Sequence, residues 1–333
     1  MATGLLFLWP AFSFSKKNEG IRLVRPKGWP KPVYNLKNNP ITESGFKLGR
    51  KLFYDPILSR DGTISCASCH TQWSAFTHID HGLSHGIEGR KGKRNSLSLF
   101  NLAWNTSFMW DGGINNLEVQ PLGPINNKAE MDNTLENVIK QLDKSLAYRD
   151  GFYDAFGDSA ITGQRVLKAL AQFTVMFQSY NSRYDKYMRK EAGGEMSPQE
   201  LHGLSIVRGK CSTCHPEPLF TNYSYQNTGL PLEPDLKDYG RMTITGDPAD
   251  SLKFKVPSLR NVVMTYPYMH DGRFRSIRQV LDHYTNSIVQ SPTLAIEFKQ
   301  GMALSDQDKK DIIAFLETLT DKDFLQNPLL REQ

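Results

Sequence analysis

The stretch Cys66-Ala67-Ser68-Cys69-His70 and its counterpart Cys211-Ser212-Thr213-Cys214-His215 decide how the chain is organised. Each is a C-x-x-C-H motif, which is typical of c-type haem attachment. Two thiols at this spacing on a helical turn can bond to the two vinyl groups of one haem, and the histidine that follows can donate an imidazole nitrogen to the iron. The sequence therefore predicts two covalent haems, attached through Cys66, Cys69, Cys211 and Cys214, with His70 and His215 as iron ligands.

Two other interpretations of paired cysteines fit this sequence less well. A redox-active C-x-x-C pair does not require a histidine after it in both places, and a four-cysteine zinc site would leave both histidines unexplained. The chain has 4 cysteines, and all of them lie in the two motifs. We therefore expect no disulfide framework.

The length and composition indicate a globular chain with one haem in each half. The 333 residues suit two domains, expected at residues 20–190 and 191–333, with a boundary in the charged segment that ends in Gly193-Gly194. The formal net charge of +5 comes from 40 basic and 35 acidic residues. The sequence has no basic run of the kind that binds nucleic acid, so no nucleic-acid partner is expected.

The N-terminal segment suggests export. Haem attachment of this type takes place outside the cytoplasm, and residues 4–14 read GLLFLWPAFSF, which is apolar like the core of a signal peptide. This segment lacks a basic flank before it and a clear cleavage site after it, so residues 1–19 are interpreted as a signal or a retained anchor. We expect a periplasmic protein, because no later stretch is long and apolar enough to span a bilayer.

Several segments with helical apolar spacing begin with a capping residue. The expected N-caps are Thr42, Asn133, Thr162, Ser197 and Ser305. Asp55-Pro56 is expected to end the first helix, and residues 95–130 and 216–260 are expected to be long loops. Strand signals are few. The predicted fold class is all-α, with two cytochrome c-like haem domains and long irregular loops.

Six blocks between Gly45 and Tyr284 resemble, in order, the bacterial dihaem cytochrome c peroxidases and their relative MauG, the methylamine dehydrogenase maturation enzyme. The blocks are LGRKLFYDPILSRDGTISCASCH, KRNSLSLFNLAWN, MWDGG, QPLGPINNKAEM, CSTCH and KVPSLRNVVMTYPYMHDGRF. The resemblance implies a peroxidase that reduces hydrogen peroxide at the haem held by His70. Electrons from a small cytochrome c or cupredoxin would enter through the haem held by His215. A homodimer is left open.

The resemblance also assigns roles to single residues. Gln120 and Glu130 match the polar pair over the peroxide-binding haem, where a buried carboxylate can move a proton between the two peroxide oxygens. Trp110 matches a tryptophan between the two haems. Asn95, Thr265 and Pro267 match positions that hold a calcium ion between the haems, and oxygen donors of this kind suit calcium.

Two departures from the family pattern leave iron ligands open. Many of these peroxidases have a histidine after the first motif that binds the first haem in the resting state, and here the candidates are His85, His78, His81 or none. At the position where the peroxidases carry a methionine ligand to the second haem, this chain has Tyr284, as MauG has a tyrosine. The other candidates there are His283, Met264 and Met269.

Two other functions are alternatives to the peroxidase. A MauG-like oxidase would use peroxide to modify a protein side chain by long-range electron transfer, and Tyr284 favours it. A dihaem electron-transfer cytochrome without enzymatic activity is disfavoured by Gln120 and Glu130, because an electron carrier has no use for an acid–base pair.

Overall fold

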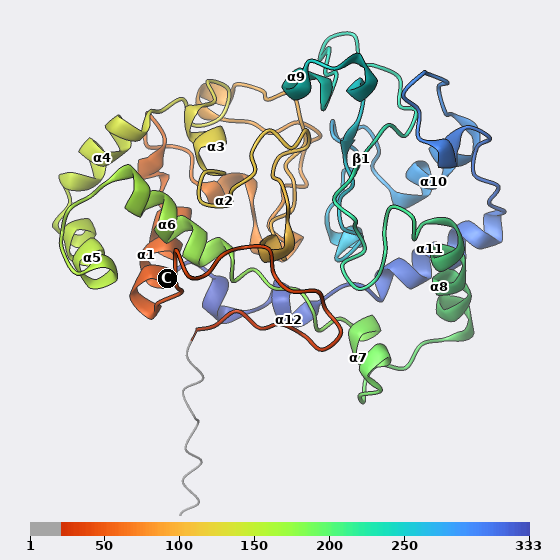
Figure 1. The fold of residues 1–333 in the computed structure, drawn as a ribbon, viewed down its shortest axis with the longest axis horizontal. Coiled ribbons are helices and arrows are strands. Elements are labelled where there is room, and N and C mark those ends of the chain that lie inside the picture. The colour runs from red at the N-terminus through yellow and green to blue at the C-terminus, as the bar shows by residue number, and fades with distance from the viewer. Residues whose placement is uncertain (1–20) are drawn as a thin grey trace, which may run out of the picture.

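The computed structural model describes residues 21–333, which form two lobes side by side along the long axis (Figure 1). The helices of the first lobe are α1 (Glu43–Tyr54), α2 (Cys66–Cys69), α3 (Leu122–Asn126), α4 (Leu135–Asp143), α5 (Leu146–Phe156) and α6 (Gly163–Thr174). The remaining helices are α7 (Arg183–Arg189), α8 (Pro198–Lys210), α9 (Met242–Thr245), α10 (Ile277–Asn286), α11 (Asp306–Glu317) and α12 (Lys322–Leu325). Two strands of two residues, β1 (Tyr225–Gln226) and β2 (Phe254–Lys255), pair antiparallel with Tyr225 opposite Lys255. The expected all-α class with long irregular loops is confirmed.

Most of the expected helix starts are found. The side chains of Thr42, Thr162, Ser197 and Ser305 each accept a hydrogen bond from a backbone N–H in the first turn of a helix. Helix α1 ends at Tyr54, directly before Asp55-Pro56. Asn133 was the wrong cap: the side chain of Thr134 caps α4, because Oδ1 of Asn133 already accepts hydrogen bonds from the backbone N–H of Thr134 and the side-chain amide of Asn137.

In each lobe, the helix before the haem motif crosses a later helix at a glycine. A β-carbon on Gly49 of α1 would lie 1.9 Å from the carbonyl oxygen of Ala169 in α6. A β-carbon on Gly203 of α8 would lie 1.9 Å from the carbonyl oxygen of Asp311 in α11. No side chain fits at these distances, so glycine allows each pair of helices to approach closely.

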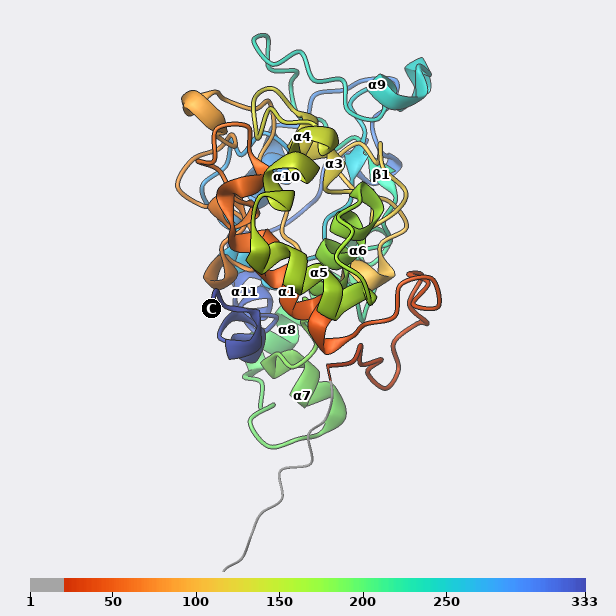
Figure 2. The same cartoon turned by 90° about the vertical axis from the view of Figure 1, so that its left-hand side faces the viewer.

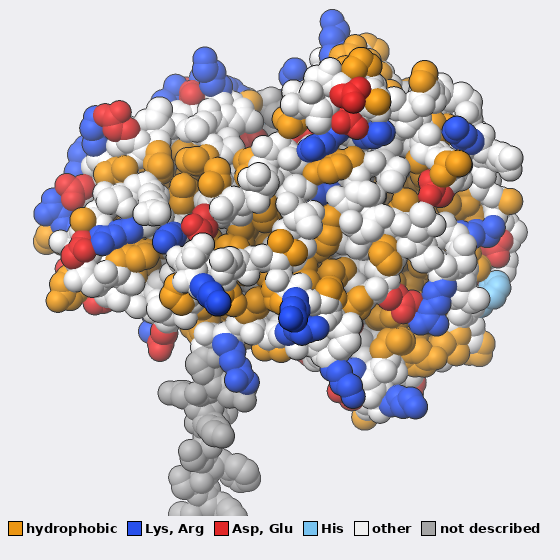
Figure 3. All heavy atoms as spheres, viewed as in Figure 1, with side chains coloured by type: hydrophobic (Ala, Val, Ile, Leu, Met, Phe, Trp, Pro, Cys, Tyr) orange, Lys and Arg blue, Asp and Glu red, His pale blue; other side chains and the backbone are white. Residues whose placement is uncertain are grey.

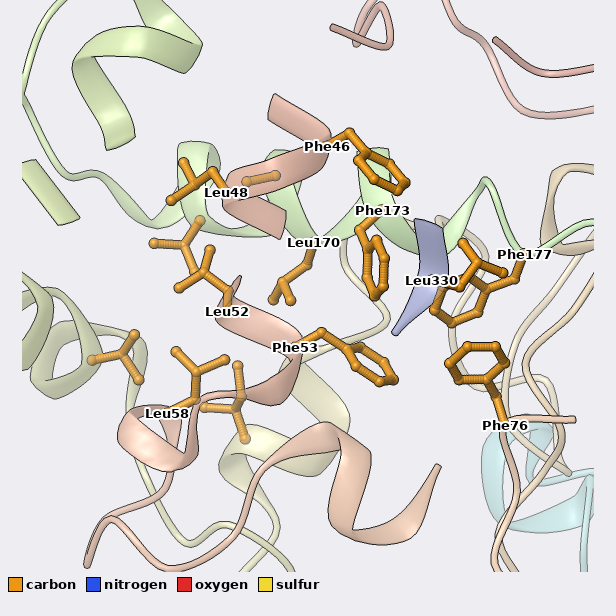
Figure 4. Close-up of a cluster of buried hydrophobic side chains, with 14 of the residues drawn as sticks. Phe46, Leu48, Leu52, Phe53, Leu58, Phe76, Leu170, Phe173, Phe177 and Leu330 are labelled. Carbon is orange, nitrogen blue, oxygen red and sulfur yellow. The ribbon is translucent and has the colours of Figure 1, made fainter. Parts of the chain in front are cut away.

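Aromatic side chains fill the core of the first lobe. Phe53 of α1 packs edge-on against Phe173 and Phe177, with ring centroids 5.4 and 5.6 Å apart (Figure 4). Phe76, from the loop after the first haem motif, stacks on Phe177 at 3.8 Å. Helices α1, α5 and α6 pack together around this core at the outer end of the lobe (Figure 2).

The last residues of the chain return to the first lobe. Phe324 and Leu330 belong to its core, and the hydroxyl of Tyr54 donates a hydrogen bond of 2.7 Å to the carbonyl oxygen of Leu330. Tyr184, which precedes the expected boundary at residue 190, packs in the core of the second lobe. The limits of the two expected domains stay a prediction.

The two lobes meet through two loops of similar sequence, which form an internal repeat. Residues 98–113 read SLFNLAWNTSFMWDGG and residues 258–273 read SLRNVVMTYPYMHDGR. The shared asparagine has a φ of 54° in both copies, and the shared methionine has φ values of 68° and 73°. We call residues 95–113 the first crossover loop and residues 255–273 the second crossover loop.

The two crossover loops exchange equivalent hydrogen bonds. The backbone N–H of Asn95 donates to the carbonyl oxygen of His270 over 2.7 Å, and the backbone N–H of Lys255 donates to the carbonyl oxygen of Trp110 over 2.7 Å. Asn95 and Lys255 are equivalent positions of the repeat, and so are Trp110 and His270. The interface between the lobes is therefore built with internal two-fold similarity.

Charge is mixed over the surface that Figure 3 shows, where basic and acidic side chains alternate without a large area of one sign. This agrees with the modest net charge. Within residues 21–333, no helix is long and apolar enough to cross a membrane. The apolar stretch at residues 4–14, interpreted as a signal or an anchor, lies outside the described residues.

Candidate functional site

The first haem motif presents a neutral histidine with one free ring nitrogen. His70 follows α2, and its Nδ1 lies 2.7 Å from the carbonyl oxygen of Phe76. Nδ1 therefore carries the proton, which leaves Nε2 for a metal ion. Burial lowers the pKa of His70 to about 4, so the imidazole stays neutral, as a metal ligand must.

The second motif repeats this arrangement. The Nδ1 of His215 lies 2.9 Å from the carbonyl oxygen of Phe220, and burial lowers its pKa. Phe76 and Phe220 both adopt left-handed backbone conformations, with φ values of 57° and 53°. Such a conformation is unfavourable for a large side chain, and packing in the two aromatic cores holds each carbonyl in place.

The four cysteines have the properties of haem-attachment sites. All four are free thiols, and burial raises the pKa of Cys66 to about 12 and those of Cys69 and Cys211 to about 11. Within residues 21–333, no group of three or more His, Cys, Asp or Glu side chains is arranged to hold a metal ion. The cysteines lie as two pairs of free thiols, each followed directly by a histidine, and this donor set fits the attachment of one haem at each pair.

A cavity of about 630 Å³ opens beside the first motif, between the lobes. Its volume lies within the range of about 300–1,000 Å³ that ligand sites occupy. Its lining includes Cys69 and His70 from the first motif, residues of both crossover loops, and the predicted site residues Trp110, Gln120 and Glu130. The structure thus brings together three side chains that the sequence places up to 20 positions apart.

Gln120 and Glu130 lie on either side of the short helix α3. The amide of Asn127 donates a hydrogen bond of 2.7 Å to Oε1 of Glu130. Burial raises the pKa of Glu130, and this hydrogen bond opposes the shift because it stabilises the carboxylate. Asn127 was not identified from the sequence, although its place three residues before the glutamate is typical of a local side-chain cap.

Trp110 lies where the two lobes meet. Its indole N–H donates a hydrogen bond of 2.9 Å to the carbonyl oxygen of Asn95, and its own carbonyl oxygen accepts the bond from Lys255. Arg94, beside Asn95, forms ion pairs with Asp111 in the first crossover loop and with Asp238 in the second lobe. These contacts fix the tryptophan at the lobe interface.

The predicted calcium ligands lie on the two crossover loops. Asn95 is buried, and its amide nitrogen donates to the carbonyl oxygen of Gly82, so its Oδ1 is the atom left for a cation. Thr265 and Pro267 precede His270, which accepts the backbone hydrogen bond from Asn95. The calcium site stays a prediction.

The three loop histidines contact one another. The ring centroids of His78 and His81 are 4.1 Å apart, and those of His81 and His85 are 4.0 Å apart. The described lining of the cavity includes Ser84 but none of these histidines. A histidine ligand opposite His70 stays a prediction, with His85 as the candidate nearest the expected spacing.

Tyr284 of α10 packs in the second lobe beside Cys211, with its ring 4.8 Å from that of Phe298. Burial raises its pKa, and the thiols of Cys211 and Cys214 add to the shift. The ring nitrogen Nε2 of the neighbouring His283 is engaged by the carbonyl oxygen of Thr228 at 2.9 Å. Tyr284 as the second ligand of the haem held by His215 stays a prediction, with His283 as the alternative.

Comparison with known proteins places these features in context. The sequence profile of a family described as di-haem cytochrome c peroxidase matches residues 43–193. The methylamine utilization protein MauG of Methylorubrum extorquens is 35% identical over 307 residues, covering 90% of this chain and 83% of the relative. The cytochrome c551 peroxidase of Nitrosomonas europaea is 36% identical over 282 residues, covering 82% of this chain and 79% of the relative.

A solved structure is similar over nearly the whole chain. It is described as a MauG-like protein associated with microbial copper homeostasis, with a TM-score of 0.80 and 32% sequence identity. The match covers 92% of this chain and 97% of the other.

Proposed function

Because the chain belongs to the di-haem cytochrome c peroxidase family, which includes the MauG proteins, we propose that it reduces hydrogen peroxide to water with electrons from a small redox protein. Membership of this family implies two c-type haems, and the two C-x-x-C-H motifs are where they attach.

One observation carries the proposal: Glu130 and Gln120 line the same cavity as His70. An electron carrier needs a buried iron and a path to the surface, but it has no need of a carboxylic acid and an amide on the open side of the cofactor. Burial raises the pKa of Glu130, and a carboxyl group with a raised pKa is better suited to accept a proton and then to donate it.

The chemistry follows from these side chains. A haem attached at Cys66 and Cys69 and held by His70 would supply the iron that binds peroxide and passes electrons to it. Glu130 accepts the proton from one peroxide oxygen and delivers it to the other, so that the O–O bond breaks with the departure of water. Gln120 orients the oxygens by hydrogen bonding. Two electrons and two further protons complete the reduction of one peroxide to two waters.

Electrons must cross between the lobes. Trp110 is hydrogen bonded to both crossover loops, and an aromatic side chain there lowers the barrier to electron movement. The donor is a small cytochrome c or a cupredoxin in the periplasm. The name of the Nitrosomonas relative supports the cytochrome.

The test is peroxide-dependent oxidation of a reduced small cytochrome c by the purified holoprotein. A matched control is Cys66→Ala/Cys69→Ala, which removes the attachment site of one haem and keeps the second motif. Turnover by the parent, and its loss in the control together with one of two haems, is the expected result. A parent with two haems and no turnover would refute the peroxidase.

A MauG-like oxidase is the second candidate, and the position of Tyr284 favours it. Such an enzyme would store two oxidising equivalents and withdraw electrons from a protein side chain. The chain is 35% identical to a MauG protein and 36% identical to a peroxidase, so sequence identity does not distinguish the two functions. The ligand of the second haem must distinguish them.

A further inference from the structure

A buried lysine lies against the cavity between the lobes. Lys255, the second residue of β2, is 6% exposed and lines the cavity with His70 and Trp110. Its ammonium group donates a hydrogen bond of 2.9 Å to the carbonyl oxygen of Ser107 and lies 5.9 Å from the centre of the Phe108 ring. Among the described residues, no carboxylate forms an ion pair with it.

Within residues 21–333, no carboxylate is paired with this buried ammonium group. Burial lowers the pKa of Lys255 to about 8, and attraction by Asp111 opposes the shift without restoring the usual value. Asp111 is itself bound by Arg94 at 2.5 Å. A buried cation with one neutral partner is unfavourable, and a carboxylate close to it would remove most of that cost.

The fold does not need a charge at this position. Asn95 is the equivalent residue of the first crossover loop, and its backbone N–H makes the same exchange between the lobes. An uncharged side chain therefore serves the structural role in one copy of the repeat. The exchange between the lobes uses the backbone N–H of Lys255 and does not need its ammonium group.

The other cationic side chains that line the cavity are either paired with carboxylates or exposed to solvent. Arg94 is paired with Asp111 and Asp238. The remaining basic residues of the described lining are exposed to solvent, and they are Lys91, Lys93 and Lys237. Within the described lining, Lys255 is the buried cation that lacks a carboxylate.

We propose that Lys255 binds a carboxylate of the group that fills this cavity, and that this carboxylate is a propionate of the haem attached at Cys66 and Cys69. The inference rests on the proposed haem protein. Every haem carries two propionates, which are anionic at neutral pH. The lining includes Cys69 and His70 but no residue of the second motif, which assigns the contact to the first haem.

This contact has a redox consequence. A positive charge held near the ring stabilises the state with the added electron, and its effect is large where water is excluded. Loss of the charge should shift the reduction potential of the first haem to a more negative value. The second haem should shift less.

The decisive variant is Lys255→Asn, because the equivalent position of the repeat already carries asparagine. Lys255→Arg keeps the charge, and Lys253→Asn is the matched control, since Lys253 lies two residues earlier and pairs with Asp250. Spectroelectrochemical titration of each holoprotein gives both potentials, and the haem content of each variant is measured beforehand. Lys255→Asn should lower the first potential, whereas Lys255→Arg and Lys253→Asn should leave it near that of the parent.

A potential in Lys255→Asn that matches the Lys253→Asn control would overturn the proposal. So would a crystal structure of the holoprotein with both propionates of the first haem beyond hydrogen-bonding distance of Lys255. Should Lys255→Asn lose haem or fail to fold, the Lys255→Arg potential and that crystal structure decide. A parent without peroxide turnover would refute the peroxidase and leave this contact intact, so the two failures are distinguishable.

Discussion

The side-chain amide of Asn127 lies 2.7 Å from Oε1 of Glu130 and holds this carboxylate at the wall of the cavity that contains His70. Burial and this hydrogen bond act in opposite directions on the pKa of Glu130, and burial has the larger effect. The pair therefore determines both where the carboxylate lies and the pH at which it can accept a proton. Two predictions rest on it.

Glu130→Gln should lower peroxide turnover by about 10²–10⁴-fold, because general acid–base help of this kind is lost while both haems stay attached. Steady-state oxidation of a reduced cytochrome measures the change. Glu136→Gln is the matched control, since Glu136 is exposed on α4 and pairs with Lys140. Near-parent turnover in Glu130→Gln would show that another group moves the proton.

Asn127→Ala should move the acid limb of the pH profile to higher pH. The carboxylate form of Glu130 must accept a proton, so activity rises as pH passes through its pKa. Removal of a donor that stabilises the carboxylate raises that pKa further. The neighbouring Asn126→Ala, exposed at the end of α3, should leave the limb in place. A uniform loss of rate without a shift of the limb would mean that Asn127 acts on structure alone.

Tyr284→Met should raise the reduction potential of the haem held by His215. A phenolate is a hard, anionic ligand that favours ferric iron, and a thioether favours ferrous iron. The parent should also react with stoichiometric peroxide in its fully ferric form. Tyr284→Phe keeps the ring packing against Phe298 and removes the hydroxyl, which separates ligation from packing. A parent that reacts only after one-electron reduction would exclude Tyr284 as ligand.

Calcium removal by a chelator should slow electron transfer between the haems more than it destabilises either lobe. The candidate ligands lie on the crossover loops, and Asn95 also accepts the indole hydrogen bond of Trp110 through its carbonyl oxygen. Asn95→Ala should reproduce the effect of chelation, whereas the exposed Asn38→Ala should not. Equal inter-haem rates before and after chelation, measured by flash reduction, would count against the site.

Gly203→Ala should destabilise the protein by about 1–3 kcal/mol, because the new methyl group would meet the backbone of α11 and push the two helices apart. Gly209→Ala is a control in the same helix, and no atom lies within 4 Å of its β-carbon position. That change should be neutral or stabilising by up to about 1 kcal/mol, from the better helix propensity of alanine. Urea unfolding of the two variants distinguishes close packing from propensity.

Local patterns predicted much of this molecule. The C-x-x-C-H motifs predict where the two haems attach, since attachment chemistry needs a fixed spacing. Thr42 and Ser197 mark helix starts, because capping depends on near neighbours. Helix α5 was not predicted, because Gly151 and several polar residues interrupt its apolar spacing. The pairing of Arg94 with Asp238 could not be predicted, because it joins residues that meet only after the lobes have docked.

Some candidate site residues could be identified from the sequence and others could not. Glu130, Gln120 and Trp110 came from resemblance to the family, and the cavity brings them together. Lys255 was not identified, because a lone lysine in a short strand usually faces solvent. The repeat that makes it equivalent to Asn95 is present in the sequence, but it is preserved at too few positions to stand out without the exchanged hydrogen bonds.

The return of the C-terminus to the first lobe governs the order in which the protein can mature. The ring centroids of Phe324 and Phe76 are 5.8 Å apart, and the carbonyl oxygen of Phe76 is the one that orients His70. The side-chain amide of Gln72 donates a hydrogen bond to the carbonyl oxygen of Asn327. Residues 324–330 follow both haem-attachment motifs in the sequence and therefore leave the ribosome after them. The lobe that is synthesised first can therefore complete its core only after residues 324–330 have been made, and by then both haem-attachment motifs have already been made.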